Sequence, residues 1–255
     1  MGKIIAIFNR KGGVGKTTTS INLSAALAHY SKRVLLVDLD PQGNSSQGLG
    51  FDISLINKCV FDVLNNNEKI ENVIKKTKVE NLDILPSKLK LASLDIVKNE
   101  TDPNYVSLKE SLNSIIDIHD YVIIDCPHTL GYLSLNALVA ANTVLIPVQC
   151  EYFALAAVSQ ILSSISKVQT TLNPDLSIEG FLLTMYDSKT NHDNEISNEI
   201  RSLFKENTFS TEIPRNISIP ESNMRGEPVT IYRPNSIGAI SYFSLAREVI
   251  DNGRK

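Results

Sequence analysis

A glycine-rich segment near the start of the chain has the residue types that bind phosphate. Residues 9–18 read Asn-Arg-Lys-Gly-Gly-Val-Gly-Lys-Thr-Thr. The glycines let the backbone curl so that its N–H groups point at phosphate oxygens. Lys16 can reach the β- and γ-phosphates of a nucleotide, and the Thr17 hydroxyl can bind Mg²⁺. The segment therefore predicts a phosphate-binding loop, formed by Lys11, Gly12, Gly13, Val14, Gly15, Lys16, Thr17 and Thr18.

The sequence on either side of this loop supports the prediction. An apolar run at residues 4–8 precedes the loop, and a helical pattern at 17–30 follows it. A strand, a glycine loop and a helix are the context that a phosphate-binding loop requires. The helix N-terminus adds partial positive charge at the same place. The alternative is a glycine-rich turn with no ligand, and this context argues against it.

Aspartates follow two other apolar runs. Asp38 and Asp40 lie in the segment Asp-Leu-Asp-Pro-Gln-Gly-Asn, and Asp125 ends the run Tyr-Val-Ile-Ile-Asp. An apolar strand that ends in aspartate can hold Mg²⁺ directly or through water. Phosphoryl transfer needs mainly positioned charge rather than covalent help from the protein. The first two aspartates also fit an ordinary polar turn, but the loop at 9–18 favours a role in phosphate chemistry.

Apolar runs alternate with helical patterns along the chain, which predicts an α/β fold. Near-continuous Val, Ile and Leu runs suit parallel strands that are covered on both faces. We therefore expect a mainly parallel sheet flanked by helices on both faces, with ligands at its carboxyl edge. The expected strands are 3–8, 33–38, 82–85, 121–125, 143–148 and 178–184. The expected helices are 17–30, 88–98, 105–118, 131–141, 154–172, 193–207 and 237–251.

The rest of the sequence and its composition bear on the number of domains and on the functions that the protein could have. Four prolines predict irregular chain over 210–236, and we expect one domain over 1–255. The formal net charge is −3, so no overall basic field attracts nucleic acid. Three cysteines lie far apart without a CxxC pair, which favours a reducing cytoplasm. We expect neither a signal peptide nor a membrane span.

The loop departs from the usual Walker A pattern and matches a variant of it. The usual pattern has glycine where this chain has Arg10, and Lys11 is an additional lysine. The motif resembles that of the deviant Walker A ATPases, a group that includes ParA, MinD and the nitrogenase iron protein. In that group the additional lysine reaches the phosphates held by the other subunit. The resemblance therefore implies a P-loop NTPase that forms an ATP-sandwiched homodimer, with catalytic roles for Lys11 and Lys16.

The resemblance covers nearly the whole chain and is closest to the Soj-like chromosomal branch of ParA proteins. Further matching segments are 130–131, 136–138, 146–152, 182–187, 213–216, 226–229 and 232–239. The resemblance implies that Asp40 is the catalytic aspartate of the first switch, which helps to order Mg²⁺ and the attacking water. It implies that Asp125 ends a Walker B strand and joins Thr17 and Asp40 at the metal. It also implies that Pro214 and Asn216 contact the adenine.

The function implied by this resemblance is a cytoplasmic, Mg²⁺-dependent ATPase for chromosome or plasmid partitioning. ATP would drive dimerisation, and the dimer would bind DNA nonspecifically and so associate with the nucleoid. A ParB-type centromere-binding partner would stimulate hydrolysis. No membrane partner is expected. The chain enters the loop strand at once, so we expect no N-terminal DNA-binding extension of the kind found in some plasmid relatives.

Three positions depart from the pattern of the branch. Lys189 and Ser218 stand where the branch commonly has DNA-binding arginines, and His128 stands where it usually has a second proline. Lysine keeps a charge that attracts phosphate, whereas serine has none. We therefore expect Ser218→Arg to strengthen DNA binding. The candidate DNA-binding residues are Lys189, Arg215 and Arg225, with Arg233 a weaker candidate.

Three alternative functions remain open. A MinD-like membrane-cycling ATPase would need a C-terminal amphipathic helix, but the last expected helix has the pattern of a packed one and only residues 252–255 follow it. A redox or cluster-carrying relative would need paired cysteines across a dimer. A nucleotide-dependent scaffold with little hydrolysis would result if the altered residues had changed the switch.

Overall fold

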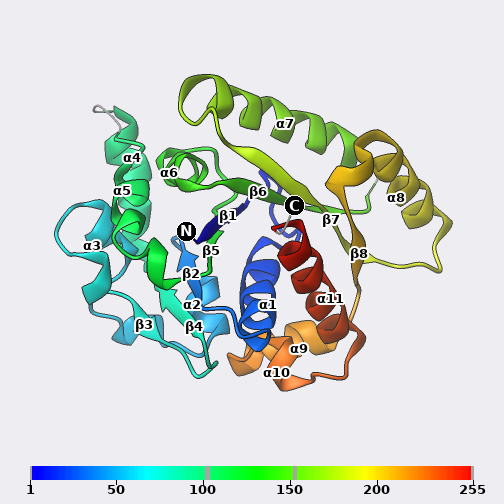
Figure 1. Ribbon diagram of the computed structural model, residues 1–255, viewed down its shortest axis with the longest axis horizontal. Helices are drawn as coiled ribbons and strands as arrows, with labels where there is room; N and C mark the ends of the chain where they lie inside the picture. Colours follow the sequence, from blue (N-terminus) through cyan, green and yellow to red (C-terminus); the bar gives the residue numbers. More distant parts are fainter. Residues whose placement is uncertain (1, 101–103, 152–153, 254–255) are drawn as a thin grey trace.

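A mainly parallel β-sheet forms the centre of the protein (Figure 1). The computed structural model describes residues 2–100, 104–151 and 154–253. Tyr152, which ends the matching segment 146–152, and the C-terminal residues Arg254 and Lys255 lie outside these ranges. Within them, eight strands follow the order β3-β4-β2-β5-β1-β6-β7-β8. Their bounds are β1 Lys3–Ile7, β2 Val34–Asp38, β3 Lys75–Lys76, β4 Leu82–Leu85, β5 Tyr121–Asp125, β6 Thr143–Gln149, β7 Ser177–Tyr186 and β8 Thr208–Pro214.

The register of the three central strands aligns their carboxyl ends. β5 pairs in parallel with β1 on one side and β2 on the other. In these ladders Asp125 lies opposite both Ile7 and Asp38. The chain that follows each of these strands therefore emerges at one point of the sheet edge. All described strand pairs are parallel except β3 with β4.

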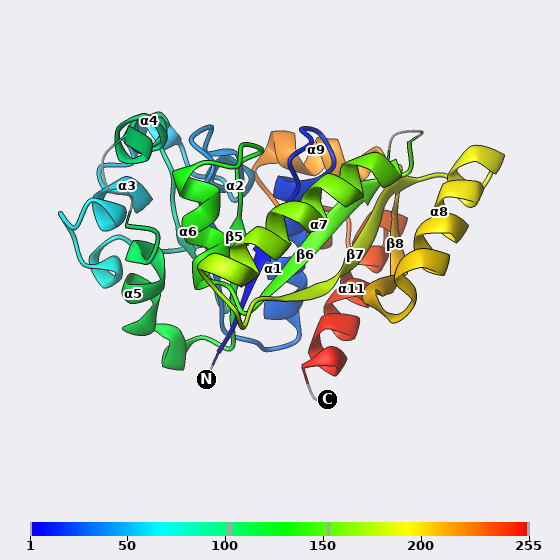
Figure 2. The same ribbon diagram turned by 90° about the horizontal axis from the view of Figure 1, so that it is seen from above.

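Helices cover both faces of the sheet, as Figures 1 and 2 show. The side chains of α1, α10 and α11 share one apolar core with one face of the sheet. The opposite core joins the other face to the helices from α3 to α8. The helix bounds are α1 Lys16–His29, α2 Asn44–Gly48, α3 Val60–Leu64, α4 Ala92–Glu100, α5 Ser107–Asn113, α6 Tyr132–Ala140, α7 Ala154–Thr171, α8 Asn191–Phe204, α9 Ser218–Arg225, α10 Val229–Tyr232 and α11 Ile237–Asn252. Short 3₁₀ segments are η1 Ile53–Leu55, η2 Ile70–Asn72, η3 Leu89–Leu91, η4 Ile116–Ile118 and η5 Lys205–Asn207.

Local sequence explains why the main elements form where they do. Each of β2 and β5 is five residues long with every residue buried, as expected for strands covered on both faces. The α11 helix begins at a serine cap, because the Ser236 hydroxyl accepts a hydrogen bond from the N–H of Ala239 at 3.2 Å. Thr190 caps α8 in the same way through the N–H of Asp193.

The expected α/β architecture is confirmed, and each expected strand appears with bounds shifted by at most two residues. The expectation of irregular chain over 210–236 is wrong, because this stretch contains part of β8 as well as α9 and α10. Its prolines occupy positions that need no N–H donor. Pro214 ends the edge strand β8, Pro220 lies in the first turn of α9, and Pro228 caps α10. The expected helix 105–118 is split into α5 and η4.

Candidate functional site

The glycine-rich loop connects β1 to α1 and is braced by the neighbouring strands. Asn9 is buried; its Nδ2 donates to the Pro147 carbonyl of β6 at 2.7 Å, and its Oδ1 accepts from the Lys11 N–H at 2.9 Å. The Thr184 hydroxyl of β7 donates to the Val14 carbonyl at 2.9 Å. Gly15 has φ +91°, a conformation that side chains rarely adopt. The loop is therefore held open as a backbone cradle at the end of β1.

Lys16 lies over this cradle at the start of α1. Only 8% of the residue is exposed, and its Nζ donates to the Lys11 carbonyl at 3.0 Å. Burial lowers the pKa of the Lys16 ammonium, and the negative charges of Asp125 and Asp40 act in the opposite direction. The Lys16 ammonium, beside the backbone N–H groups of the loop, is suited to bind phosphate oxygens because it carries further N–H donors besides the one bonded to Lys11.

Two buried carboxylates lie beneath the loop. Asp38 and Asp125 are both fully buried at the ends of adjacent strands. Asp125 accepts hydrogen bonds from the hydroxyls of Ser20 at 3.1 Å and Ser45 at 2.8 Å. Asp38 accepts from the N–H of Ser46 at 2.8 Å and from its hydroxyl at 2.7 Å. Ser20 belongs to α1, and Ser45 and Ser46 belong to the first turn of α2, so these two helices position both acids.

The electrostatics of this pair fit a bound cation. Burial, reinforced by the charge of Asp125, raises the pKa of Asp38 to about 8. Burial also raises the pKa of Asp125 to about 6, although hydrogen bonds from Ser45, Thr17 and Ser20 oppose the rise. Two neighbouring carboxylates ionise together more easily beside a positive charge. Mg²⁺ in proteins commonly takes one or two carboxylates and completes its shell with phosphates and waters, so these residues fit a magnesium nucleotide.

Asp40 lies in the turn that follows β2, close to the loop. Its Oδ1 accepts from the Gln42 N–H at 2.9 Å, and its own N–H donates to Asp38 Oδ1 at 3.3 Å. The charge of Asp40 also acts on Lys16, Asp38 and Asp125. The residues expected at the phosphates and the metal therefore come together: the loop, Lys16, Thr17, Asp40 and Asp125.

A cleft of about 460 Å³ adjoins the loop and includes the residues expected at the adenine. Pro214 and Asn216 both line it, beside Gly15 and Thr18 of the loop. Asn216 Oδ1 accepts from the Ser218 N–H at 3.0 Å, which leaves the side-chain amide N–H groups for a ligand. Met185, Asn223 and Tyr242 also line the cleft. They come from separate elements, so local patterns gave no signal for them.

Lys11 points away from its own phosphate cradle. Its Nζ forms an ion pair with Glu151, which follows β6, and both side chains are partly exposed. Sequence reasoning assigned no role to Glu151. The pairing leaves the Lys11 charge at the surface of the protomer, beside the loop rather than inside it.

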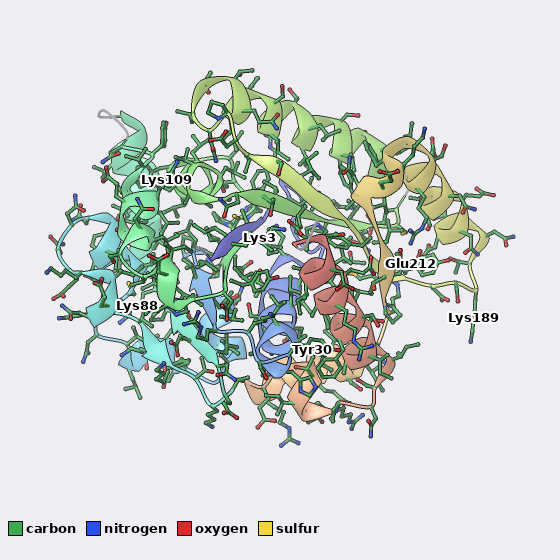
Figure 3. The ribbon with its side chains drawn as sticks, viewed as in Figure 1. Lys3, Tyr30, Lys88, Lys109, Lys189 and Glu212 are labelled. Carbon is green, nitrogen blue, oxygen red and sulfur yellow. The ribbon has the colours of Figure 1, made fainter. Side chains whose placement is uncertain are left out.

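The candidate DNA-binding residues do not share one element. Figure 3 shows Lys189 projecting from the segment between β7 and α8, away from the body of the protein. Arg215 lines the adenine cleft, and Arg225 lies in the last turn of α9. Arg233 pairs with Glu221 at 3.3 Å. Ser218 is buried, so an arginine there would disturb the start of α9, and the expected gain in DNA binding does not follow.

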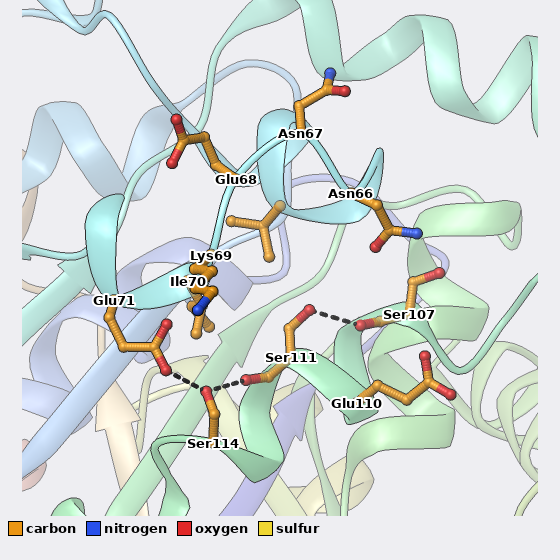
Figure 4. Close-up of a pocket in the computed structure, with 11 residues that line it drawn as sticks. Asn66, Asn67, Glu68, Lys69, Ile70, Glu71, Ser107, Glu110, Ser111 and Ser114 are labelled. Carbon is orange, nitrogen blue, oxygen red and sulfur yellow. Dashed lines mark hydrogen bonds between the residues drawn. The ribbon is translucent and has the colours of Figure 1, made fainter.

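Other features that suggest chemistry do not form a second site of this kind. A cleft of about 520 Å³ between η2 and α5 contains Glu68, Glu71 and Glu110 (Figure 4). Glu68 pairs with Lys58, Glu71 accepts from the Ser114 hydroxyl, and the lining includes no part of the glycine loop.

The three cysteines are buried and free, and burial raises the pKa of Cys126 and Cys150, which makes their thiols unreactive. Among the helices that the structure describes, none has the length and hydropathy of a membrane span.

Comparisons with known proteins identify the family. The AAA domain family matches residues 2–178. The sporulation initiation inhibitor protein Soj of Bacillus subtilis is 49% identical over 253 residues, which cover 99% of this chain and 100% of that protein. The chromosome partitioning protein ParA of Myxococcus xanthus is 43% identical over 250 residues, which cover 98% of this chain and 88% of that protein. The chain belongs to the ParA/Soj family of ATPases.

Membership of the ParA/Soj family confirms the predicted class of enzyme, an ATP hydrolase. A solved structure adds a view of the ligands. The cobyrinic acid a,c-diamide synthase of Mycobacterium smegmatis, with bound ATP analogue and magnesium, has a TM-score of 0.88 and 34% identity. The structural match covers 100% of the present chain and 97% of the synthase chain. Its ligands agree with the expected cofactors, ATP and Mg²⁺.

The bracing of the loop leads to a prediction for Asn9→Ala. The substitution removes the hydrogen bond that holds the loop to β6 and a second one within the loop, and we expect it to weaken ATP binding about tenfold. Isothermal titration with a non-hydrolysable ATP analogue measures the effect. Asn72→Ala is the matched control, because Asn72 is exposed and its side-chain amide donates to Glu68, outside the loop. Equal affinity in the Asn9 variant and the parent would contradict the proposed brace.

Proposed function

We propose that this protein is a Mg²⁺-dependent partitioning ATPase that works as an ATP-sandwiched homodimer. The observation that carries the proposal is the register of β1, β2 and β5. It gathers the phosphate loop, the buried aspartates and Asp40 at one edge of the sheet. The name of the ParA relative from Myxococcus xanthus, a chromosome partitioning protein, supports a role in positioning DNA. In this proposal residues 1–255 act as one domain.

Each residue has a distinct part in the proposed hydrolysis. The backbone of Gly12 to Gly15 and the ammonium of Lys16 hold the phosphates. Thr17, Asp40 and Asp125 would hold Mg²⁺, which would supply positive charge to neutralise the phosphates, and Asp40 would also orient the attacking water. Pro214 and Asn216 contact the adenine in the adjoining cleft. Lys11 neutralises charge that develops on the phosphates of the partner protomer, because charge stabilisation is the main requirement of phosphoryl transfer.

Two features support dimerisation through the carboxyl edge of the sheet. Lys11 lies at the surface and is paired with Glu151 instead of its own cradle. In addition, exposed apolar side chains come from segments that follow several strands at this edge, which favours contact with another protein surface. These residues are Leu55, Leu89, Leu130, Ile217 and Met224.

In the finer part of the proposal, the ATP-bound dimer binds DNA nonspecifically in the cytoplasm and thus associates with the nucleoid. A ParB-type protein stimulates hydrolysis and releases the dimer. Each protomer has a formal charge of −3, so the affinity must come from local cations. The contributors are Lys189, Arg215 and Arg225, and dimerisation doubles each of them. Binding through phosphates then depends strongly on salt.

The two lysines of the loop test the sandwich arrangement. Lys16→Ala should abolish ATP binding, because it removes the buried cation from the cradle. Lys11→Ala should bind ATP nearly as well as the parent but fail to dimerise with it. Titration calorimetry gives the affinity, and sedimentation velocity with a non-hydrolysable analogue gives the mass. A Lys11→Ala protein that dimerises normally would rule out the sandwich.

Salt titration tests the DNA-binding residues. With a non-hydrolysable analogue bound, each of Lys189→Ala, Arg215→Ala and Arg225→Ala should reduce the slope of log affinity against log salt. The reduction should be about one unit for each phosphate contact that is lost. Lys109→Ala on α5 is the control, and Figure 3 shows Lys109 far from Lys189. DNA affinity that does not depend on nucleotide, or that no variant alters, would reject this surface.

A further inference from the structure

A third cleft, of about 650 Å³, lies on the outer side of the glycine loop. The start of the loop, the segment after β5 and the start of α7 form its walls. Arg10, Lys11 and His128 all line it, and so does Gln160 of α7. Arg10, which departs from the usual Walker A pattern, and His128, which departs from the pattern of the branch, are 118 positions apart but meet here, beside the additional lysine.

Of the two cationic side chains that line this cleft, the described part of the structure shows a carboxylate partner for Lys11 but not for Arg10. None of its lining residues is an Asp or a Glu. Lys11 is neutralised by Glu151, which lies outside the lining. Among the described residues, Arg10 and His128 have no ion-pair partner. Because arginine stays charged at every physiological pH, Arg10 is the permanent cation of this cleft that no carboxylate neutralises.

We propose that Arg10 is a second phosphate-binding residue that acts across the dimer. Its guanidinium contacts phosphate oxygens of the ATP held by the partner protomer, beside Lys11. This inference rests on the proposed ATP-sandwiched dimer.

The chemistry of the two cations supports a division of roles. A guanidinium presents a planar fork that bonds two phosphate oxygens at once, whereas an ammonium acts as a point charge. Arg10 is free to attract phosphate from the moment two protomers approach. Lys11 must first exchange Glu151 for phosphate, and an ion pair as exposed as this one is weak enough to exchange. His128 adds a hydrogen-bonding ring to the same wall.

The position of Arg10 favours phosphates from outside its own protomer. Its neighbour Asn9 is buried and fixed to β6, and the loop turns into its cradle only after Lys11. The cleft that Arg10 lines contains no residue from 12 to 18, where the cradle and the start of α1 lie. We therefore expect the anion that binds in this cleft to come from the partner protomer.

The test compares Arg10→Gln and Arg10→Lys in the full-length protein. We expect Arg10→Gln to bind a non-hydrolysable ATP analogue within twofold of the parent when measured below the dimerisation concentration. We expect its dimer dissociation constant, measured by sedimentation with the same analogue, to rise about tenfold or more, because a charge-assisted contact is lost in each half of the dimer. Arg10→Lys should recover part of this loss. Arg247→Gln is the matched control, since Arg247 contacts Tyr30 and lies outside the lining of the cleft.

The outcomes separate this inference from the proposal on which it rests. Normal dimerisation of Arg10→Gln, together with failure of Lys11→Ala, would overturn the role of Arg10 and leave the sandwich intact. Normal dimerisation of both variants would reject the sandwich itself. Loss of analogue binding by monomeric Arg10→Gln would mean that Arg10 acts within its own protomer. Weaker DNA binding by an Arg10→Gln dimer of normal stability would assign the cleft to DNA phosphates. Either of the last two results would also overturn the inference.

Discussion

The parallel register of β2 and β5 is the constraint on which the rest of the site depends. It places Asp38 and Asp125 side by side at full burial, where the desolvation of each carboxylate and their mutual repulsion both oppose ionisation. The structure offers partial compensation, through the hydroxyls of three serines and Thr17, the N–H groups of Ser46 and Asp40, and the nearby ammonium of Lys16. A site built in this way favours a divalent cation. The same arrangement explains why the phosphate loop lies directly above it, after β1.

The elements that hold these acids pack closely against another part of the site. Ser45 and Ser46 belong to α2, and α2 is followed by Gly50, which abuts the end of α9. A Cβ atom on Gly226 would lie 2.8 Å from the Gly50 Cα, so no side chain fits between the two segments. Because α9 also borders the adenine cleft, the elements that position the acids pack directly against an element of the base site.

Local patterns were sufficient to select the residues of the candidate catalytic centre but not those of the surfaces around it. The loop, Asp40 and Asp125 each follow an apolar run within a few residues, so type and spacing predicted them. Glu151 and Tyr242 were not predicted, because their roles depend on strands and helices brought together from distant segments. β8 was missed because proline usually interrupts a sheet, whereas an edge strand tolerates it at its end. Ser218 was expected at the surface because a sequence match does not reveal burial.

The behaviour of Asp40→Ala tests the central claim most directly. The substitution removes the carboxylate that we propose orders the attacking water but leaves the loop, Lys16 and Asp125 in place. With Mg²⁺ and ATP, sedimentation velocity and phosphate release are measured on the same sample, next to the parent. The account predicts a persistent species of twice the protomer mass with hydrolysis slowed at least about a hundredfold, as for loss of a group that acts on the transition state. A variant that stays monomeric with ATP, or that hydrolyses it at the parent rate, would contradict the account.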